Sequence, residues 1–300
     1  MAGQKRTCGQ IMGEFGEFMW NSRTREFMGR TGSSWALILL FYLVFYAFLT
    51  ALFSLTMWVM LQTIDEYNPK YSDRLANPGL MIRPKLDALE IVYNLSKKGD
   101  NYEWTKYVNN LNTVLNDYNT SVQEQRGSVC VSGVFNRQDD TGDVRNYPKK
   151  ACQFLRSTLQ DCSGENDTTY GYQSGQPCIL IKMNRVIHFF PEIVKDLSNT
   201  SITINCTGKN EEQDRLLGDR IYFPSNNGSS LGTIDLMYYP YYGNKAQKNY
   251  TQPLVAVKFL NLTRKMDHNV ECRVNAVNIN NKDERDKFAG RVMFRLRVDN

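Results

Sequence analysis

The chain has 300 residues, of which 42% are hydrophobic and 22% charged, and its formal net charge is +5. The balance is only slightly basic and the Lys and Arg residues are scattered, which excludes a nucleic-acid-binding surface and hence a nucleic-acid partner. The length is sufficient for a membrane anchor and a folded domain with its own core.

The first 34 residues are expected to form a cytoplasmic tail. They contain five basic and three acidic residues and one cysteine, Cys8, whose role the sequence leaves open. Aromatic residues such as Phe15, Phe18 and Trp20 are spread through the tail with no core to bury them. Either these rings lie against the inner leaflet or a partner protein, or the tail is disordered.

Residues 35–61 contain no Asp, Glu, Lys or Arg, which predicts a transmembrane helix. At 1.5 Å per residue this helix is about 40 Å long, more than the roughly 30 Å of hydrocarbon in a bilayer. Basic residues before the span, with Asp65 and Glu66 soon after it, predict a cytoplasmic N-terminus. No small-residue cleavage site follows, so we interpret the helix as a type II signal-anchor surrounded by membrane lipid.

One face of this helix is aromatic, because Tyr42, Phe45 and Tyr46 recur at helical spacing and are continued by Leu49 and Phe53. A tyrosine hydroxyl within a bilayer needs a hydrogen-bonding partner, which favours contact with another transmembrane helix. The alternative is that these rings simply face lipid.

Residues 62–89 are rich in proline and charge and follow neither the helical nor the strand period, so we expect an extended extracellular stalk. Residues 101–118 are expected to form an amphipathic helix. Its apolar positions, at steps of four and three, are Trp104, Val108, Leu111, Leu115 and Tyr118.

Short β-rich runs follow, beginning at Cys178, Ser201, Pro253, Asn269 and Arg291. In the last run apolar residues alternate with Arg291, Arg295 and Arg297, which is typical of a half-solvated antiparallel strand. Residues 90–300 are therefore predicted to form a disulfide-bonded, immunoglobulin-like β-sandwich with one accessory α-helix.

Cysteines and glycosylation signals agree that this region lies outside the cell. Six cysteines imply three disulfides of open pairing: Cys130, Cys152, Cys162, Cys178, Cys206 and Cys272. A zinc site is the alternative, but no two of them have C-x-x-C spacing. Eight N-glycosylation sequons follow the span, at Asn94, Asn119, Asn166, Asn199, Asn205, Asn227, Asn249 and Asn261.

No catalytic motif is present: the sequence lacks a Walker loop, an H-E-x-x-H and a G-x-S-x-G. His188 stands alone in a strand pattern and is a poor candidate for a ligand or base. Type II glycosyltransferases share the topology, but the exterior has no Asp-x-Asp pair for a nucleotide-sugar metal. We therefore expect no enzyme, no cofactor, no metal and no small-molecule substrate.

Several strings resemble the beta subunits of the Na,K- and H,K-ATPases, and the resemblance covers the whole chain. They are MGRTGSSW before the span, FYLVFY within it, PKYSDRLANPGLMIRP, YGYQSGQPC, IDLMYYPYYG, QPLVAVKFLNLT and DERDKFAGR. The resemblance implies a plasma-membrane protein that binds the catalytic alpha subunit of a P-type pump. It further implies that the chain assists folding, export and membrane insertion of that subunit and adjusts its potassium affinity.

The resemblance also assigns residues. It implies the pairs Cys130–Cys152 and Cys162–Cys178, which close local loops, and Cys206–Cys272, which staples distant strands. It places Tyr42, Phe45 and Tyr46 against the seventh transmembrane helix of the alpha subunit. It associates the string YYPYYG with the loop after that helix, so Tyr238, Tyr239, Tyr241 and Tyr242 are expected to anchor the exterior contact, the alternative being that they fill the core.

A glycosylated, immunoglobulin-like exterior on a single anchor is also how cell-contact molecules are built. Adhesion independent of a pump is therefore the alternative function that the sequence leaves open.

Overall fold

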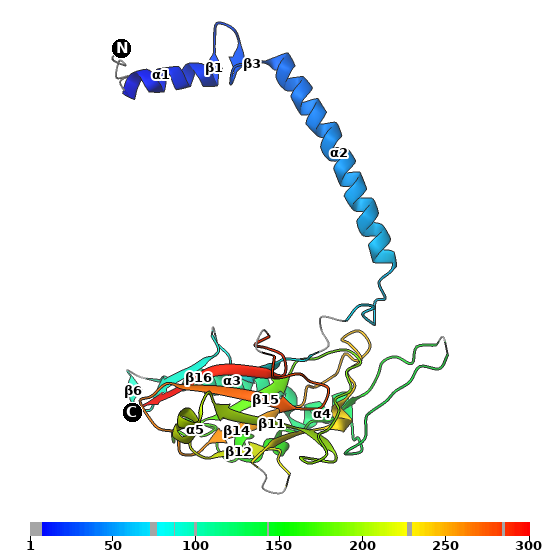
Figure 1. Cartoon of the computed structure of the whole chain (residues 1–300), viewed down its shortest axis with the longest axis vertical. Helices are drawn as coiled ribbons and strands as arrows, with labels where there is room; N and C mark the ends of the chain where they lie inside the picture. The colour runs from blue at the N-terminus through cyan, green and yellow to red at the C-terminus, as the bar shows by residue number, and fades with distance from the viewer. Residues whose placement is uncertain are drawn as a thin grey trace. The chain divides into compact units, whose positions relative to one another are not determined.

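The computed structural model describes residues 8–72, 77–86, 88–98, 101–142, 144–226, 230–283 and 286–300. The chain forms two compact units, residues 1–65 (unit 1) and 66–300 (unit 2). Unit 1 contains α1 (Cys8–Met19), β1 (Trp20–Asn21), β2 (Glu26–Phe27), β3 (Arg30–Thr31) and α2 (Gly32–Gln62), as Figure 1 shows.

The predicted span is the helix α2, which has 31 residues and extends slightly beyond the apolar run at both ends. The mean hydropathy of its 18-residue apolar window is 2.5 and none of that window is buried within the chain, so the helix is long and apolar enough to cross a membrane. The indole of Trp35 donates a hydrogen bond of 2.9 Å to the carbonyl of Phe27, which ties the start of α2 to the preceding hairpin.

Unit 2 is a sandwich of two sheets that share one apolar core. One sheet has the order β12 (Arg220–Phe223), β14 (Val255–Phe259), β10 (Cys178–Met183) and β4 (Leu80–Arg83). The other has the order β13 (Gly232–Asp235), β11 (Ser201–Gly208), β15 (His268–Asn275), β16 (Arg291–Asp299) and β5 (Glu90–Asn94). The predicted sandwich class is therefore confirmed.

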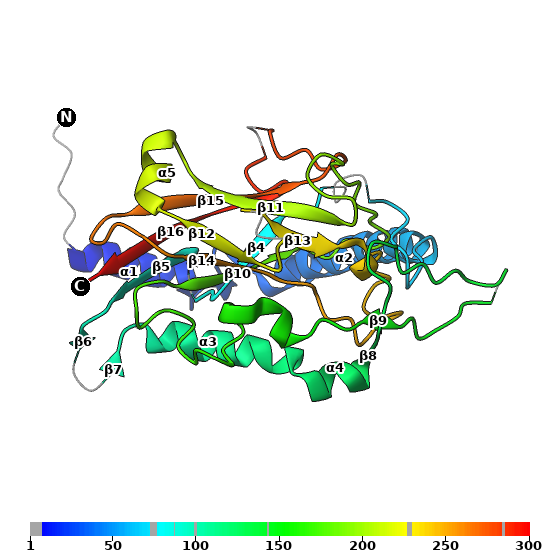
Figure 2. The ribbon, with the colours of Figure 1, turned by 90° about the horizontal axis from the view of Figure 1, so that it is seen from below.

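Short elements complete unit 2. The small strand pairs are β6 (Lys97–Lys98) with β7 (Asn101–Tyr102), and β8 (Gly127–Ser128) with β9 (Ala151–Cys152). The helices are α3 (Thr105–Leu115), η1 (Asn116–Tyr118), α4 (Thr120–Arg126), η2 (Arg156–Cys162), α5 (Glu211–Leu217) and η3 (Leu236–Tyr238). Figure 2 shows α3 and α4 on the β10 side of the sandwich and α5 on the β11 side.

The predicted accessory helix is present as α3 with η1, but it begins at Thr105 rather than at residue 101, because Asn101–Tyr102 form β7. All five of its expected apolar positions are buried. The alternation predicted for β16 is also present, because Val292, Phe294, Leu296 and Val298 are buried. Arg291 breaks the pattern: it is buried and its guanidinium pairs with Glu271 at 3.3 Å. β16 runs antiparallel to β15, as expected, but parallel to β5 on its other side.

The expected stalk differs from the structure at β4. Residues 80–83 alternate between buried and half-buried, and β4 pairs antiparallel with β10, so this part of the stalk is an edge strand of the sandwich. The Ile82 side chain is fully buried in the core. Flanking prolines concealed the strand period, because only four residues of it lie between Pro78 and Pro84.

Two tyrosine hydroxyls occupy places on strand edges where a further strand would otherwise pair. Tyr107 of α3 donates to the Val92 carbonyl of β5 and accepts from the Val92 amide, both at 3.0 Å. Tyr222 of β12 reaches across the sandwich and bonds the Cys206 amide at 2.9 Å and its carbonyl at 3.3 Å. Both side chains are buried, so these bonds satisfy backbone groups that water cannot reach.

Replacing Tyr222 by Phe is predicted to lower the free energy of unfolding of unit 2 by about 1 to 3 kcal/mol, because the buried Cys206 amide loses its acceptor. For a domain of this size the melting temperature of the full chain in detergent should fall by roughly 3 to 10 °C. Tyr102→Phe is the matched control, since Tyr102 is exposed and stacks on Trp104 through its ring alone. Equal melting temperatures for wild type and Tyr222→Phe would contradict the role of this hydroxyl.

Candidate partner-binding surfaces and modification sites

The aromatic face of α2 is preformed in the chain. The rings of Tyr42 and Tyr46 stack at 5.9 Å and those of Phe45 and Tyr46 meet edge to face at 5.5 Å. Phe41, which the sequence reasoning did not include, stacks on Phe45 at 6.0 Å. All four rings are exposed on the isolated helix, so they are free to meet lipid or another helix.

The tyrosine segment, residues 238–242, is largely buried within unit 2, and contact of its rings with a partner stays a prediction. The exposed fractions of Tyr238, Tyr239, Tyr241 and Tyr242 are 8%, 6%, 7% and 8%. Tyr238 and Tyr239 belong to the sandwich core, and the Phe154 ring lies 5.5 Å from that of Tyr238. Core packing, the alternative weighed above, describes these two residues.

Tyr242 contacts three other residues of the chain. Its hydroxyl accepts a hydrogen bond of 2.6 Å from the Gln138 amide, and its amide donates to the Gln247 side chain at 3.2 Å. The ammonium of Lys149 lies 5.4 Å from the ring centre. Lys149 is buried, and its hydrogen bond of 2.5 Å to Asp140 lowers the pKa of that carboxyl.

Tyr241 differs from its neighbour because its hydroxyl has no hydrogen-bonding partner among the described residues. Its ring packs 4.7 Å from that of Tyr250, and the Arg185 guanidinium lies 5.4 Å from the ring centre. Burial raises the pKa of Tyr241, so the group is a neutral hydroxyl at physiological pH. A partner could therefore exchange a hydrogen bond with it.

The first residues of unit 2 dock beside this segment, which the sequence did not reveal. Tyr67 stacks on Tyr147 at 4.8 Å, and Glu66 forms an ion pair of 2.7 Å with Lys245. His188 bonds the Asn68 side chain through its Nε2 at 2.9 Å, and its amide donates to the Tyr241 carbonyl. Those partners give His188 a structural role.

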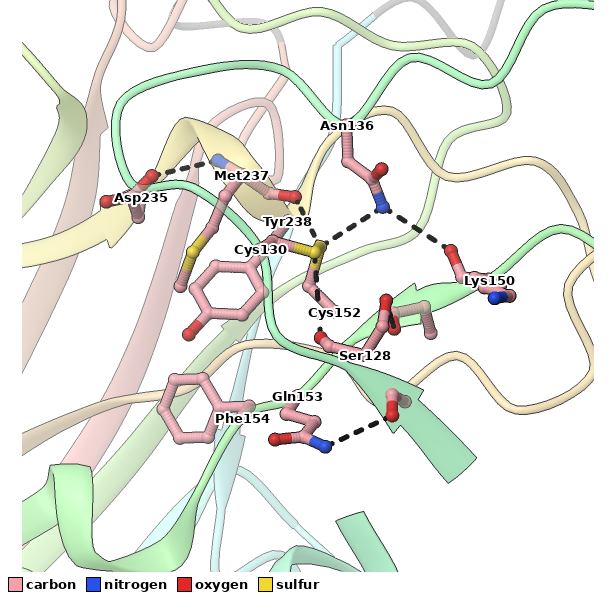
Figure 3. Close-up of a disulfide and its surroundings, with 12 residues drawn as sticks. Ser128, Cys130, Asn136, Lys150, Cys152, Gln153, Phe154, Asp235, Met237 and Tyr238 are labelled. Carbon is pink, nitrogen blue, oxygen red and sulfur yellow. Dashed lines mark hydrogen bonds between the residues drawn. A yellow bond between two sulfur atoms is a disulfide. The ribbon is translucent and has the colours of Figure 1, made fainter. Parts of the chain in front are cut away.

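The Cys130–Cys152 disulfide lies against the tyrosine segment (Figure 3). The Cys152 sulfur is 3.0 Å from the Met237 carbonyl, and the Asn136 amide nitrogen lies 3.1 Å from the same sulfur. The bond closes the base of the loop of residues 131–151, which also contains the Lys149 contact to Tyr242.

The other two bonds are Cys162–Cys178 and Cys206–Cys272, so the structure has the three pairs that the resemblance implies. Cys206 and Cys272 are 66 residues apart in sequence but directly opposite each other on the adjacent strands β11 and β15. The bond therefore joins residues that are distant in sequence, as expected, but the two strands that it joins are neighbours in the sheet.

The sequons occupy different environments, and glycosylation of each stays a prediction. Asn166, Asn199, Asn249 and Asn261 are exposed, while Asn94, Asn119 and Asn205 are half-buried. The Asn119 side chain accepts a hydrogen bond from Arg156, and the Asn261 amide nitrogen donates to Asp219 at 3.0 Å. Asn227 lies outside the described residues.

Within the described ranges, no three His, Cys, Asp or Glu side chains are grouped so that they could hold a metal ion. The Nε2 atom of His268 lies 2.7 Å from the Thr263 carbonyl, and the side chain is buried.

Comparison with known proteins matches the chain to a protein family along almost its whole length. Residues 5–294 match the family model described as sodium/potassium ATPase beta chain. The chain is 69% identical to sodium/potassium-transporting ATPase subunit beta-2 of Rhinella marina over 296 residues, covering 99% of this chain and 98% of that protein. It is 57% identical to the subunit beta-2 of Mus musculus over 297 residues, with the same coverage, and 38% identical to protein ATP1B4 of Xenopus laevis over 295 residues, covering 98% and 88%.

Replacing both Cys206 and Cys272 by Ser is predicted to lower the free energy of unfolding by about 4 kcal/mol, because the bond closes a loop of 66 residues. That loss is a large part of an ordinary stability of about 5 to 15 kcal/mol, so the variant should be retained in the endoplasmic reticulum. Surface biotinylation of cells measures export. The double Ser variant of Cys162 and Cys178, whose loop spans 16 residues, should lose less, and normal export of the first variant would refute the prediction.

Proposed function

The chain belongs to the sodium/potassium ATPase beta chain family. From that membership we infer that it is the non-catalytic beta subunit of a potassium-dependent P-type cation pump and acts on a catalytic alpha subunit. The observation that carries this inference is similarity along almost the entire length to proteins named as pump subunits, with 69% identity in one case. The chain is thus membrane-bound, with α2 as its candidate single span.

Physically, such a subunit assists a pump through contacts rather than chemistry. Binding to the folded alpha subunit stabilises it by mass action, which supports its folding, membrane insertion and export. Contacts that differ between two conformations of the pump must shift their equilibrium, and through this linkage they alter potassium affinity.

The finer localisation follows from the same proposal. The N-terminus is cytoplasmic and unit 2 lies outside the plasma membrane, where its three disulfides are stable and its sequons can be glycosylated. The proposed boundaries are a tail of residues 1–34, a span of 35–61, a stalk that starts at residue 62 and ends before β4, and an exterior domain that includes β4 and therefore begins by Leu80 rather than at residue 90. Adhesion has no comparable support, because the relatives are named for the pump.

Two surfaces are proposed to contact the alpha subunit. The first is the aromatic face of α2, formed by Tyr42, Phe45 and Tyr46. The second is the tyrosine segment, where the hydroxyl of Tyr242 is bonded within the chain whereas that of Tyr241 has no partner among the described residues and lies beside Arg185. Tyr238, Tyr239 and Tyr242 support it by packing and are proposed to touch the partner only through their exposed edges.

Replacing Tyr42, Phe45 and Tyr46 together by Leu is predicted to leave membrane insertion intact, because leucine is at least as apolar as the rings that it replaces. Association with the alpha subunit should weaken or potassium activation should shift, since ring packing and two hydroxyls are lost. Co-purification and the potassium dependence of ATP hydrolysis measure the two effects. Phe48→Leu, on another side of the helix, is the control, and a triple variant equal to wild type in both assays would rule out this face.

Tyr241→Phe is predicted to keep the stability of the free chain, because the lost hydroxyl has no internal partner in the described structure. It should weaken association with the alpha subunit by about five- to tenfold, the value of one interfacial hydrogen bond. Tyr242→Phe is the contrasting variant: it removes the acceptor of the Gln138 amide and should lower the melting temperature of the free chain. Unchanged association of Tyr241→Phe would return this tyrosine to a packing role.

A further inference from the structure

Three basic residues gather at one end of the β4–β10 pair: Arg83, Lys182 and Arg185, the basic cluster. Arg83 lies opposite Leu180 and Lys182 lies opposite Met81, so both point to the same face of the sheet. Arg185 follows two residues after the end of β10, with its guanidinium 5.4 Å from the ring centre of Tyr241. The cluster is therefore continuous with the tyrosine segment.

No carboxylate described in the structure lies within ion-pair distance of these three side chains. Among the described residues, the Arg83 side chain donates only to the Ile82 carbonyl at 3.1 Å and to the Met81 sulfur at 3.3 Å. Lys182 is half-buried, and its pKa is lowered by that burial and by the charges of Arg83 and Arg185. The free chain is destabilised by holding these like charges together.

The rest of unit 2 shows that this arrangement is unusual for the molecule. Most partly buried basic side chains elsewhere have acidic partners, and half-buried Arg156 instead donates to the Ser163 carbonyl, Asn119 and Tyr170. The pairs are Lys149 with Asp140, Arg220 with Asp214, Arg291 with Glu271, and Lys258 with Asp161. In the basic cluster, therefore, positive charges have no carboxylate partner among the described residues. They lie next to Tyr241, whose hydroxyl has no hydrogen-bonding partner there either.

We propose that the basic cluster binds an acidic extracellular segment of the catalytic alpha subunit, whose carboxylates supply the missing counter-charge beside Tyr241. The proposal rests on the function proposed above and adds the chemistry of the partner segment. Two features favour a protein loop over a lipid headgroup. Arg83 and Lys182 project from paired strands and are partly enclosed, and the guanidinium of Arg185 beside an aromatic ring is the composition of protein interfaces.

The test uses the full chain co-expressed with an alpha subunit and compares wild type with the triple variant Arg83→Gln, Lys182→Gln and Arg185→Gln. The control is Lys195→Gln, Lys209→Gln and Lys287→Gln, which removes the same charge from exposed positions outside the cluster. The dissociation rate of the detergent-solubilised complex is measured over a series of NaCl concentrations, together with the melting temperature of each free chain.

The cluster variant is expected to dissociate at least about tenfold faster at low salt, with a flatter salt dependence than wild type, while the control matches wild type. Its free chain should melt at the same or a higher temperature, because repulsion is relieved. A damaged fold would instead lower the melting temperature of the free chain, so this measurement separates loss of the partner contact from loss of folding.

Three outcomes would overturn the proposal. They are dissociation equal to wild type, equal loss in the control, and intact assembly combined with lost binding to phosphatidylserine vesicles, which would make the cluster a lipid site. Failure of the proposed function is a separate result: wild type itself would not co-purify with an alpha subunit.

Discussion

The helix α2 constrains everything else the chain can do. Thirty-one residues without a charged side chain expose their apolar surface, and water would make that exposure very unfavourable, whereas a bilayer accepts it and leaves every helical backbone bond intact. A single helix, however, cannot enclose a path for ions. A chain anchored in this way contributes to transport by binding another membrane protein, and the aromatic rings along α2 offer it a surface.

Unit 2 is built so that most of its polar groups are already used within the chain. Tyr107 and Tyr222 cap strand edges with their hydroxyls, and Lys149 and Arg291 are buried only because carboxylates reach them. Polar groups that have no partner among the described residues are therefore informative. The Tyr241 hydroxyl and the basic cluster lie side by side, which indicates where a partner would complete the structure.

The sequence predicted the features that depend on local pattern. The apolar span, the helix of residues 101–118 and the long strands had clear periods, and the structure has each of them. It did not reveal β4, because prolines confine that strand to four residues, nor the parallel pairing of β5 with β16, which is non-local. Composition also could not show whether the tyrosines of residues 238–242 are buried or exposed, since aromatic residues beside a turn occur both in cores and at interfaces. Arg291 looked solvated because Glu271 is twenty residues away in sequence.

The central claim is that this chain is the non-catalytic subunit of a cation pump. Affinity capture of the full chain from native membranes, followed by mass spectrometry and an assay of potassium-dependent ATP hydrolysis, tests it most directly. The account predicts recovery of a multi-span P-type ATPase chain in stoichiometric amount, with the activity in the captured fraction. Recovery of the chain without such a partner, from membranes that contain one, would contradict it.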